Sequence, residues 1–137
     1  MCKTLFRIAA VIMLLHDVGH TIGHLGWKKS TDEVNRRAIE AMTTNEFEFM
    51  GQQTTYGRFY DGYGFAGTIA LLLFAVILWM LSGSNTLLAR QLAVVVAIGL
   101  LLWATMEYIY FFPMAAAFSF VAAVLTGWAA LKLRPAV

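Results

Sequence analysis

Four long apolar segments make up most of this chain. They cover about residues 5–26, 60–82, 88–111 and 114–132. Each is close to the roughly 20 residues that an α-helix needs to cross the hydrocarbon core of a bilayer. The first is the most polar, because it is interrupted by His16, Asp17 and His20. The pattern predicts an all-α, polytopic membrane protein whose residues 1–137 form a single bundle of four transmembrane helices.

The third and fourth apolar segments are separated only by Phe111, Phe112 and Pro113. Proline disfavours helical backbone in the residue before it. The combined run is also about twice as long as a bilayer is thick. We therefore expect two helices joined by a tight hairpin connection, and not one long bent helix.

The first connection contains a predicted amphipathic helix at about residues 31–43. The segment Ser30 to Glu33 matches a capping box, which predicts a helix start. Glu33 and Arg37 are four residues apart, a spacing that favours an ion pair on a helix. The opposite face is apolar and carries Val34, Ala38, Ala41 and Met42. Such a helix lies on the membrane surface or over the mouth of the bundle, as a plain connector or as a functional lid.

Composition agrees with a membrane environment. Hydrophobic residues make up 60% of the chain, compared with about 45–50% in soluble domains. Ten basic and eight acidic residues leave a net charge of +2, which is too small for the basic footprint of a nucleic-acid-binding protein. The expected partner is therefore the lipid bilayer. The single cysteine, Cys2, excludes an intrachain disulfide framework.

The basic residues indicate an orientation. One side of a four-span arrangement carries Lys3, Arg7, Arg90, Lys132 and Arg134. On the other side, the loop of about residues 27–59 mixes five basic with five acidic residues. Acidic residues contribute little to orientation, so the positive charges alone leave a tie. The basic start of the first span and the short loop near Arg90 favour cytoplasmic termini in a bacterial inner membrane.

All three histidines lie in the segment His16-Asp-Val-Gly-His-Thr-Ile-Gly-His24. Ionisable side chains inside a membrane span are costly and mark a functional site by default. Helical residues four apart lie about 40° from each other around the axis, so neighbouring histidines can share one ion. His16 and His24 lie about 12 Å apart along the axis. One metal ion therefore cannot bind all three.

Acidic residues of two other spans are the expected partners of the histidines. Glu107 lies in the third span and Asp61 opens the second. His20 and Glu107 are each about six residues from the outer ends of their spans, which places both roughly 9 Å below the outer surface. This match predicts one polar site in the outer-leaflet half. Its candidate catalytic residues are His20, Glu107 and Asp61, and its candidate metal ligands are His16, His20, His24 and Glu107.

Three functions fit these residues. The first is the binding of a metal or small ligand, with zinc, iron or copper as suitable metals and haem as a less favoured cofactor. The second is an intramembrane enzyme with acid–base or metal-assisted chemistry on a lipid-like substrate. The third is a structural or accessory subunit without a catalytic site. In that case the polar residues only pair with one another, Asp17 with an imidazole and Asp61 with Arg58.

Gly19, Gly23 and Gly26 form a stripe of small residues beside the histidines. Such a stripe allows a neighbouring helix backbone to approach closely. We expect it to pack against another helix of the bundle. Glycine-rich faces of this kind also suit a homo-oligomer or a membrane partner.

Two motif matches are rejected. The segment Gly62-Tyr-Gly-Phe-Ala-Gly67 fits the dinucleotide-binding string GxGxxG, but no strand is expected before it and it opens a membrane span. Its glycines are expected to serve close helix packing. The segment His16-Asp-Val-Gly-His20 resembles the first histidine box of membrane fatty-acid desaturases. Those di-iron enzymes need several further histidines, and none follows His24.

Three stretches of the chain resemble one family. They are Gly19-His20-Thr21-Ile22-Gly23-His24, Phe47-Glu-Phe-Met-Gly51 and Tyr108-Ile-Tyr-Phe-Phe-Pro113. They are similar to motifs of a family of small, uncharacterised four-helix bacterial membrane proteins, and the resemblance covers most of the chain. It implies a four-helix membrane architecture and draws attention to His20 and His24. It implies no particular reaction.

Overall fold

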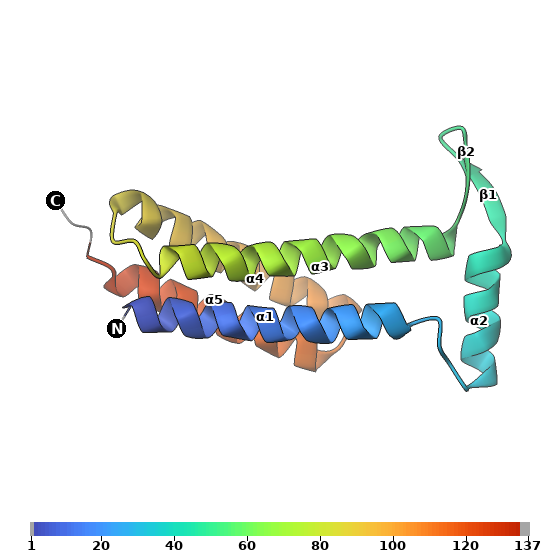
Figure 1. Cartoon of the computed structure of the whole chain (residues 1–137), viewed down its shortest axis with the longest axis horizontal. Helices are drawn as coiled ribbons and strands as arrows, with labels where there is room; N and C mark the ends of the chain where they lie inside the picture. The colour runs from blue at the N-terminus through green and yellow to red at the C-terminus, as the bar shows by residue number, and fades with distance from the viewer. Residues whose placement is uncertain (1, 135–137) are drawn as a thin grey trace. The chain divides into compact units, whose positions relative to one another are not determined.

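The computed structural model describes residues 2–134, which form five helices and one two-stranded sheet. The elements in chain order are α1 (Cys2–Gly26), α2 (Glu33–Thr44), β1 (Glu46–Phe49), β2 (Gln52–Thr55), α3 (Tyr56–Leu81), α4 (Leu87–Tyr110) and α5 (Pro113–Lys132) (Figure 1). Helices α1, α3, α4 and α5 are long and apolar enough to cross a membrane. The all-α class and the four predicted spans are therefore confirmed.

The predicted and observed ends of the spans differ most at the start of α3. Hydropathy placed this start near residue 60, whereas the helix begins at Tyr56. The hydroxyl of Thr55 accepts a hydrogen bond from the backbone N–H of Arg58 at 3.2 Å. This bond satisfies one of the free donors of the first turn. Because of this cap, α3 includes a first, more polar turn at residues 56–59 before its apolar part begins.

The described chain divides into two compact units. Unit 1 contains residues 2–17 and 70–134, and unit 2 contains residues 18–69. Helices α1 and α3 each contribute residues to both units. Each unit has its own kind of packing.

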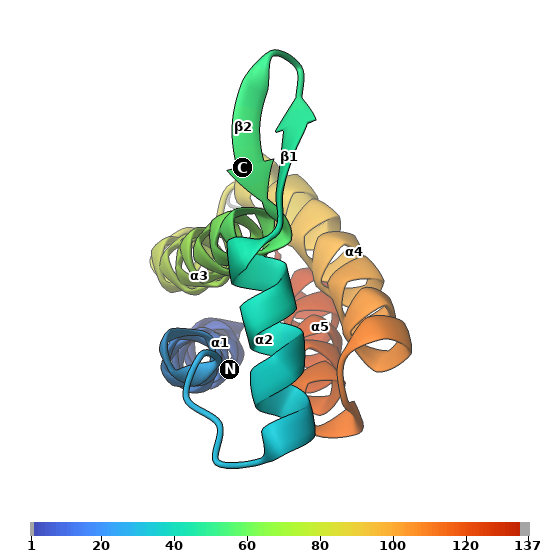
Figure 2. The same ribbon diagram turned by 90° about the vertical axis from the view of Figure 1, so that its right-hand side faces the viewer.

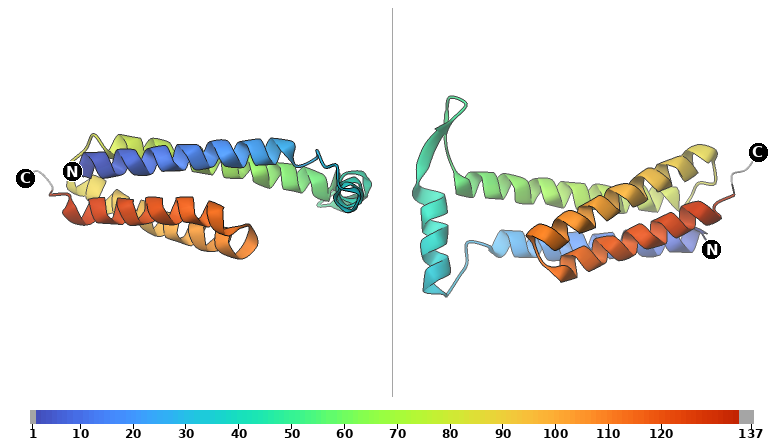
Figure 3. Two further views of the ribbon diagram at one scale, coloured as in Figure 1. Left: turned by 90° about the horizontal axis from the view of Figure 1, so that it is seen from below. Right: turned by 180° about the vertical axis from the view of Figure 1, so that it is seen from behind.

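Unit 1 has an apolar core built from α1, α3, α4 and α5. Its largest fully buried side chains include Phe6, Met13, Leu71, Leu78 and Leu100. The buried residues of α5 are all small: Ala115, Ala116, Ser119, Ala122, Ala123, Thr126, Ala129 and Ala130. Small side chains on one helix face allow close approach of a neighbouring helix. Helices α4 and α5 accordingly run side by side as an antiparallel pair (Figure 3).

The α4–α5 connection is the tight hairpin that Pro113 predicts. Helix α4 ends at Tyr110, and Pro113 occupies the first turn of α5, where its missing N–H costs no hydrogen bond. The aromatic side chains around the connection are more than half exposed; they are Tyr108, Tyr110, Phe111 and Phe112. This composition is typical of the aromatic belt at a membrane–water interface.

Helix α2 is confirmed, but its predicted cap is wrong. The helix covers Glu33–Thr44, and its N-cap is Asp32, whose side chain accepts from the backbone N–H of Asn35. Ser30 instead accepts a hydrogen bond from the backbone N–H of Asp32 at 3.3 Å. Aspartate caps a helix as well as serine does, and here Glu33 forms the expected ion pair with Arg37. The capping box is therefore replaced by a single cap two residues later.

A β-hairpin of unit 2 was not predicted. Strands β1 and β2 pair in antiparallel fashion, with Glu46 opposite Thr55, and Figure 2 shows them directly after α2. The turn residues Met50 and Gly51 have φ values of 53° and 81°, and positive φ at both positions is typical of two-residue hairpin turns. The alternation Glu-Phe-Glu-Phe before a glycine was the available signal. A strand thus precedes the GxGxxG string after all, but it belongs to a hairpin and not to a βαβ unit.

Candidate functional site

Glu107 is the centre of a buried polar network in unit 1. Its Oε1 lies 3.1 Å from Nε2 of His16 and accepts a hydrogen bond from Nε1 of Trp103 at 2.8 Å. Its Oε2 accepts from the Ser119 hydroxyl at 2.7 Å. His16, Glu107 and Ser119 are 6%, 7% and 0% exposed. The carboxyl group is therefore bound by side chains from α1, α4 and α5.

The local sequence explains this arrangement. Trp103 and Glu107 are four residues apart on α4 and lie on one helix face. Ser119 belongs to the small-residue face of α5, which brings its hydroxyl close to the carboxyl group. His16 reaches the same point from α1, and its ring centroid lies 5.6 Å from that of Phe118.

The hydrogen atoms of this network can be assigned from its geometry. Ser119 has one hydroxyl hydrogen, which it donates to Glu107. Its oxygen also lies 3.3 Å from Nδ1 of His16, so a hydrogen bond there requires Nδ1–H as the donor. The other ring nitrogen, Nε2, lies on the side of Oε1 of Glu107.

Asp17 has a different environment from its neighbour His16. Its side chain is 7% exposed, and Oδ1 is buried without a hydrogen-bond partner among residues 2–134. This oxygen therefore does not pair with an imidazole, as the structural alternative expected. We have no physical account of its burial.

The other two histidines belong to unit 2 and pack on α3. Nε2 of His20 lies 3.0 Å from the carbonyl oxygen of Gly64. A carbonyl only accepts, so Nε2 carries the hydrogen and the neutral ring keeps its lone pair on Nδ1. The rings of His20 and His24 are nearly parallel, with centroids 6.3 Å apart. The hydroxyls of Thr21 and Thr68 meet at 3.0 Å and form a further contact between the two helices.

Glycines of α3 make room for these imidazoles. A methyl group at Gly64 would overlap the ring of His24, and one at Gly67 would lie 2.9 Å from Nε2 of His20. Both glycines belong to the rejected GxGxxG string. The prediction that the glycines of this string serve close packing holds for Gly64 and Gly67, which pack against side chains and not against a helix backbone, and is wrong for Gly62, which has nothing within 4 Å.

Asp61 connects the end of α1 to the start of α3 within unit 2. Its two carboxylate oxygens accept hydrogen bonds from Nε1 of Trp27 and Nζ of Lys28, both at 2.7 Å. The predicted pairing with Arg58 is wrong, because the Arg58 guanidinium donates to the backbone oxygen of Gln53. Lys28 precedes Asp61 by 33 residues, so no local sequence pattern indicates this ion pair.

The hydrogen bonds thus divide the predicted site between the two units. His16 and Glu107 come together in unit 1, whereas His20, His24 and Asp61 belong to unit 2. Of the three histidines considered beside Glu107, His16 is the one that meets it, and His20, which was expected at the same depth, does not. Among residues 2–134, no group of three or more His, Cys, Asp or Glu side chains could hold a metal ion.

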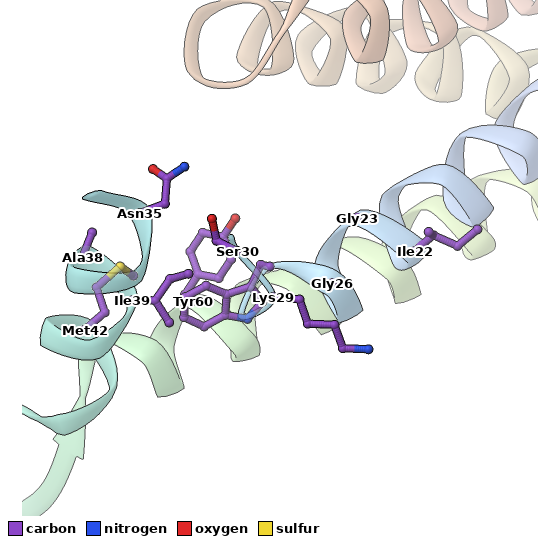
Figure 4. Close-up of a pocket in the computed structure, with 11 residues that line it drawn as sticks. Ile22, Gly23, Gly26, Lys29, Ser30, Asn35, Ala38, Ile39, Met42 and Tyr60 are labelled. Carbon is purple, nitrogen blue, oxygen red and sulfur yellow. The ribbon is translucent and has the colours of Figure 1, made fainter. Parts of the chain in front are cut away.

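A pocket of about 590 Å³ lies beside α2 in unit 2. We call it the α2 pocket; it is lined by Ile22, Gly23, Gly26, Trp27, Lys29, Ser30, Asn35, Ala38, Ile39, Met42 and Tyr60. Figure 4 shows Ile39 and Met42 extending from α2 toward Tyr60. Of the predicted apolar face of α2, Ala38 and Met42 line the pocket, whereas Val34 and Ala41 are exposed and do not; Ile39 lines it instead.

The glycine stripe of α1 lies beside this pocket and is open. A methyl group at Gly19, Gly23 or Gly26 would meet nothing within 4 Å. The expected close packing of this stripe against another helix of the bundle is therefore wrong. Close-packed glycines lie instead on α3, where Gly64 and Gly67 make room for the histidine rings.

Comparison with known proteins adds no family. No protein-family model, no curated protein and no solved structure matches the chain. The resemblance to small four-helix bacterial membrane proteins therefore stays a prediction.

Proposed function

We propose that this chain is an integral membrane protein that binds a small amphipathic ligand in the α2 pocket. The lining of the pocket carries the proposal. Apolar and aromatic side chains, including Ile22, Ile39 and Tyr60, accompany a polar part made of Lys29, Ser30 and Asn35. Ligand sites commonly combine an apolar lining with a few polar groups that orient the ligand. A long apolar chain with one carboxylate or similar group fits this division.

The hydrogen bonds of the polar residues favour unit 2 as the region that binds a ligand. In unit 1, Ser119 and Trp103 donate to Glu107, and Nε2 of His16 lies 3.1 Å from it. An acid–base enzyme needs such groups within reach of a substrate. This pairing therefore gives less support to catalysis at Glu107 than the pocket gives to ligand binding.

The proposal includes cytoplasmic termini in a bacterial inner membrane. The basic residues of the two sides are equal in number, so the support comes from Lys3 and Arg7 at the start of α1 and from the short loop before Arg90. The α2 pocket would then lie on the outer side. An amphipathic ligand can reach such a position from the adjacent leaflet.

Palmitate is a suitable probe for the α2 pocket. We suggest incorporating the protein into nanodiscs of neutral phosphatidylcholine and measuring palmitate retention by native mass spectrometry. Ala38→Trp places a large side chain in the pocket. Ala41→Trp adds the same side chain to the same helix at a position that does not line the pocket, so it serves as a matched control.

The expected result is retention by the wild type and by Ala41→Trp, with at least about a tenfold loss in Ala38→Trp. Lys29→Gln should weaken palmitate binding but leave its methyl ester unaffected, because only the carboxylate can pair with Lys29. Equal retention in both tryptophan variants, or no retention by the wild type, would contradict the proposal.

A metal ion is a second candidate ligand, at His20. Metal-binding histidines usually donate their other ring N–H to a carbonyl or carboxylate, and His20 donates Nε2–H to Gly64. Elemental mass spectrometry of the detergent-purified protein tests this candidate. Near-stoichiometric zinc or iron in the wild type, lost in folded His20→Ala, would support it. The same metal content in both proteins would exclude His20 as a ligand.

A further inference from the structure

One end of unit 1 is strongly basic. The two acidic residues of the unit, Asp17 and Glu107, are both buried. Its five basic residues lie near the start of α1, the start of α4 and the end of α5: Lys3, Arg7, Arg90, Lys132 and Arg134. These three places lie at the same end of the unit, together with the α3–α4 connection (Figure 1).

A pocket of about 440 Å³ opens at this end. We call it the basic pocket; it is lined by Cys2, Lys3, Phe6, Leu81, Ser82, Gly83, Ser84, Asn85, Leu133 and Arg134. No acidic residue is among them. Phe6, Leu81 and Leu133 are buried, so the pocket combines an apolar part with two cationic side chains.

We propose that the basic pocket binds a phosphate group. Lys3 and Arg134 supply an ammonium and a guanidinium, and both groups form strong charge-assisted hydrogen bonds with phosphate oxygens. The Asn85 amide supplies further donors of the type that bind such oxygens. The apolar part of the lining suits a phosphate that is esterified to a less polar group.

The side chains, and not the loop backbone, must provide this recognition. The backbone N–H groups of Ser82, Gly83 and Ser84 all donate to carbonyl oxygens in the last turns of α3. They are therefore not free to bind an anion in the way that glycine-rich phosphate loops do. As a result, binding should depend strongly on Lys3 and Arg134.

Two kinds of ligand carry a phosphate group that fits this pocket. One is the headgroup of an anionic phospholipid in the surrounding leaflet, and the other is free phosphate in solution. Basic residues next to membrane spans attract anionic lipids by charge alone. A specific pocket differs from this general attraction because particular residues matter more than net charge does.

Two basic residues close together in sequence, Lys132 at the end of α5 and Arg134 just after it, provide the test. Arg134→Gln removes a residue that lines the pocket, whereas Lys132→Gln removes the same charge two positions away and does not change the lining. Each variant is placed in phosphatidylcholine nanodiscs with a small fraction of phosphatidylglycerol. Native mass spectrometry then measures retained lipid, and inorganic phosphate is tested separately. Thermal unfolding confirms that both variants fold.

We expect the wild type and Lys132→Gln to retain phosphatidylglycerol or phosphate, and Arg134→Gln to lose binding by roughly tenfold or more. Retention of the lipid alone identifies a headgroup site, and binding of inorganic phosphate identifies a soluble ligand. Equal losses in the two variants would show general charge attraction and would overturn the proposal, as would the absence of binding to the wild type.

Discussion

The two units of this protein bury different kinds of groups. Unit 1 buries an apolar core and encloses the Glu107 network within it. The structure describes every residue of unit 2, and none of the apolar side chains in that unit is fully buried. The buried positions of unit 2 are His24, Thr55, Gly57, Gly64 and Gly67. The histidine segment therefore lies in two environments: His16 is in the apolar core of unit 1, and His20 and His24 are in the more polar unit 2.

This difference separates structural from functional polar groups. In unit 1, a polar group must find a partner within the chain, because the surrounding side chains are apolar. Glu107 and His16 meet that requirement together with Ser119 and Trp103, whereas Oδ1 of Asp17 is the exception among the described residues of unit 1. In unit 2, His20 and Asp61 are also paired within the chain, but the polar residues Lys29, Ser30 and Asn35 line the α2 pocket. We therefore expect substitutions in unit 1 to act mainly on stability.

The largest effect is expected from Glu107→Ala. It leaves His16, Ser119 and Trp103 without their common acceptor, and breaking a buried pair of this kind costs about 3–5 kcal/mol. The free energy of unfolding in detergent measures this loss. Glu107→Gln keeps the shape and one acceptor oxygen and should lose less.

Thr105→Ala is the control for the Glu107 substitution. Thr105 is exposed on the same helix, and its hydroxyl bonds only to the backbone oxygen of Leu101. If Glu107→Ala were as stable as this control, the network would not stabilise unit 1 and the contrast between the units would fail.

An intermediate effect is expected from Gly64→Ala in unit 2. The added methyl group overlaps the His24 ring, and such overpacking costs about 1–3 kcal/mol. Thermal unfolding measures the loss. Adding His24→Ala should restore much of the stability, because it removes the ring that the methyl group meets.

Gly62→Ala is the matched control on the same helix, since its methyl group would meet nothing within 4 Å. Similar losses in Gly62→Ala and Gly64→Ala would show that helix glycines, and not imidazole packing, explain the effect. Failure of His24→Ala to rescue Gly64→Ala would lead to the same conclusion.

The smallest effect, and one of opposite sign, is expected from Gly23→Ala. Its methyl group is also free of contacts, and alanine stabilises a helix interior by about 0.5–1 kcal/mol relative to glycine. The unfolding midpoint should rise slightly. A fall in the midpoint, or a change in molecular mass by light scattering, would instead mean that the open glycine face binds a second copy.

The helices were predictable because each depends on a pattern within one segment. Apolar length gives α1, α3, α4 and α5, and Pro113 separates the last two. The apolar and charged faces of residues 31–43 give α2. The β-hairpin has a weaker signal, because each strand has only four residues and only the first, Glu46–Phe49, alternates polar with apolar side chains.

The partners of the polar residues were not predictable in the same way. Helical spacing places His16, His20 and His24 on one stripe, but it does not say which neighbouring helix each one faces. His16 meets Glu107 beside the small-residue face of α5, and His20 reaches the Gly64 carbonyl because α3 lacks a side chain at Gly67. Both facts depend on packing between segments that are distant in sequence.

The α4–α5 connection has a mechanical consequence for unit 1. Helix α5 has 20 residues, which at 1.5 Å per residue gives about 30 Å, the thickness of a bilayer's hydrocarbon core. Exposed aromatic side chains mark one end of α5, and Lys132 and Arg134 follow at the other. Rings favour one headgroup layer and cations the opposite one. The vertical position of unit 1 is therefore fixed at both faces, and a thinner or thicker bilayer must deform around the protein or tilt it.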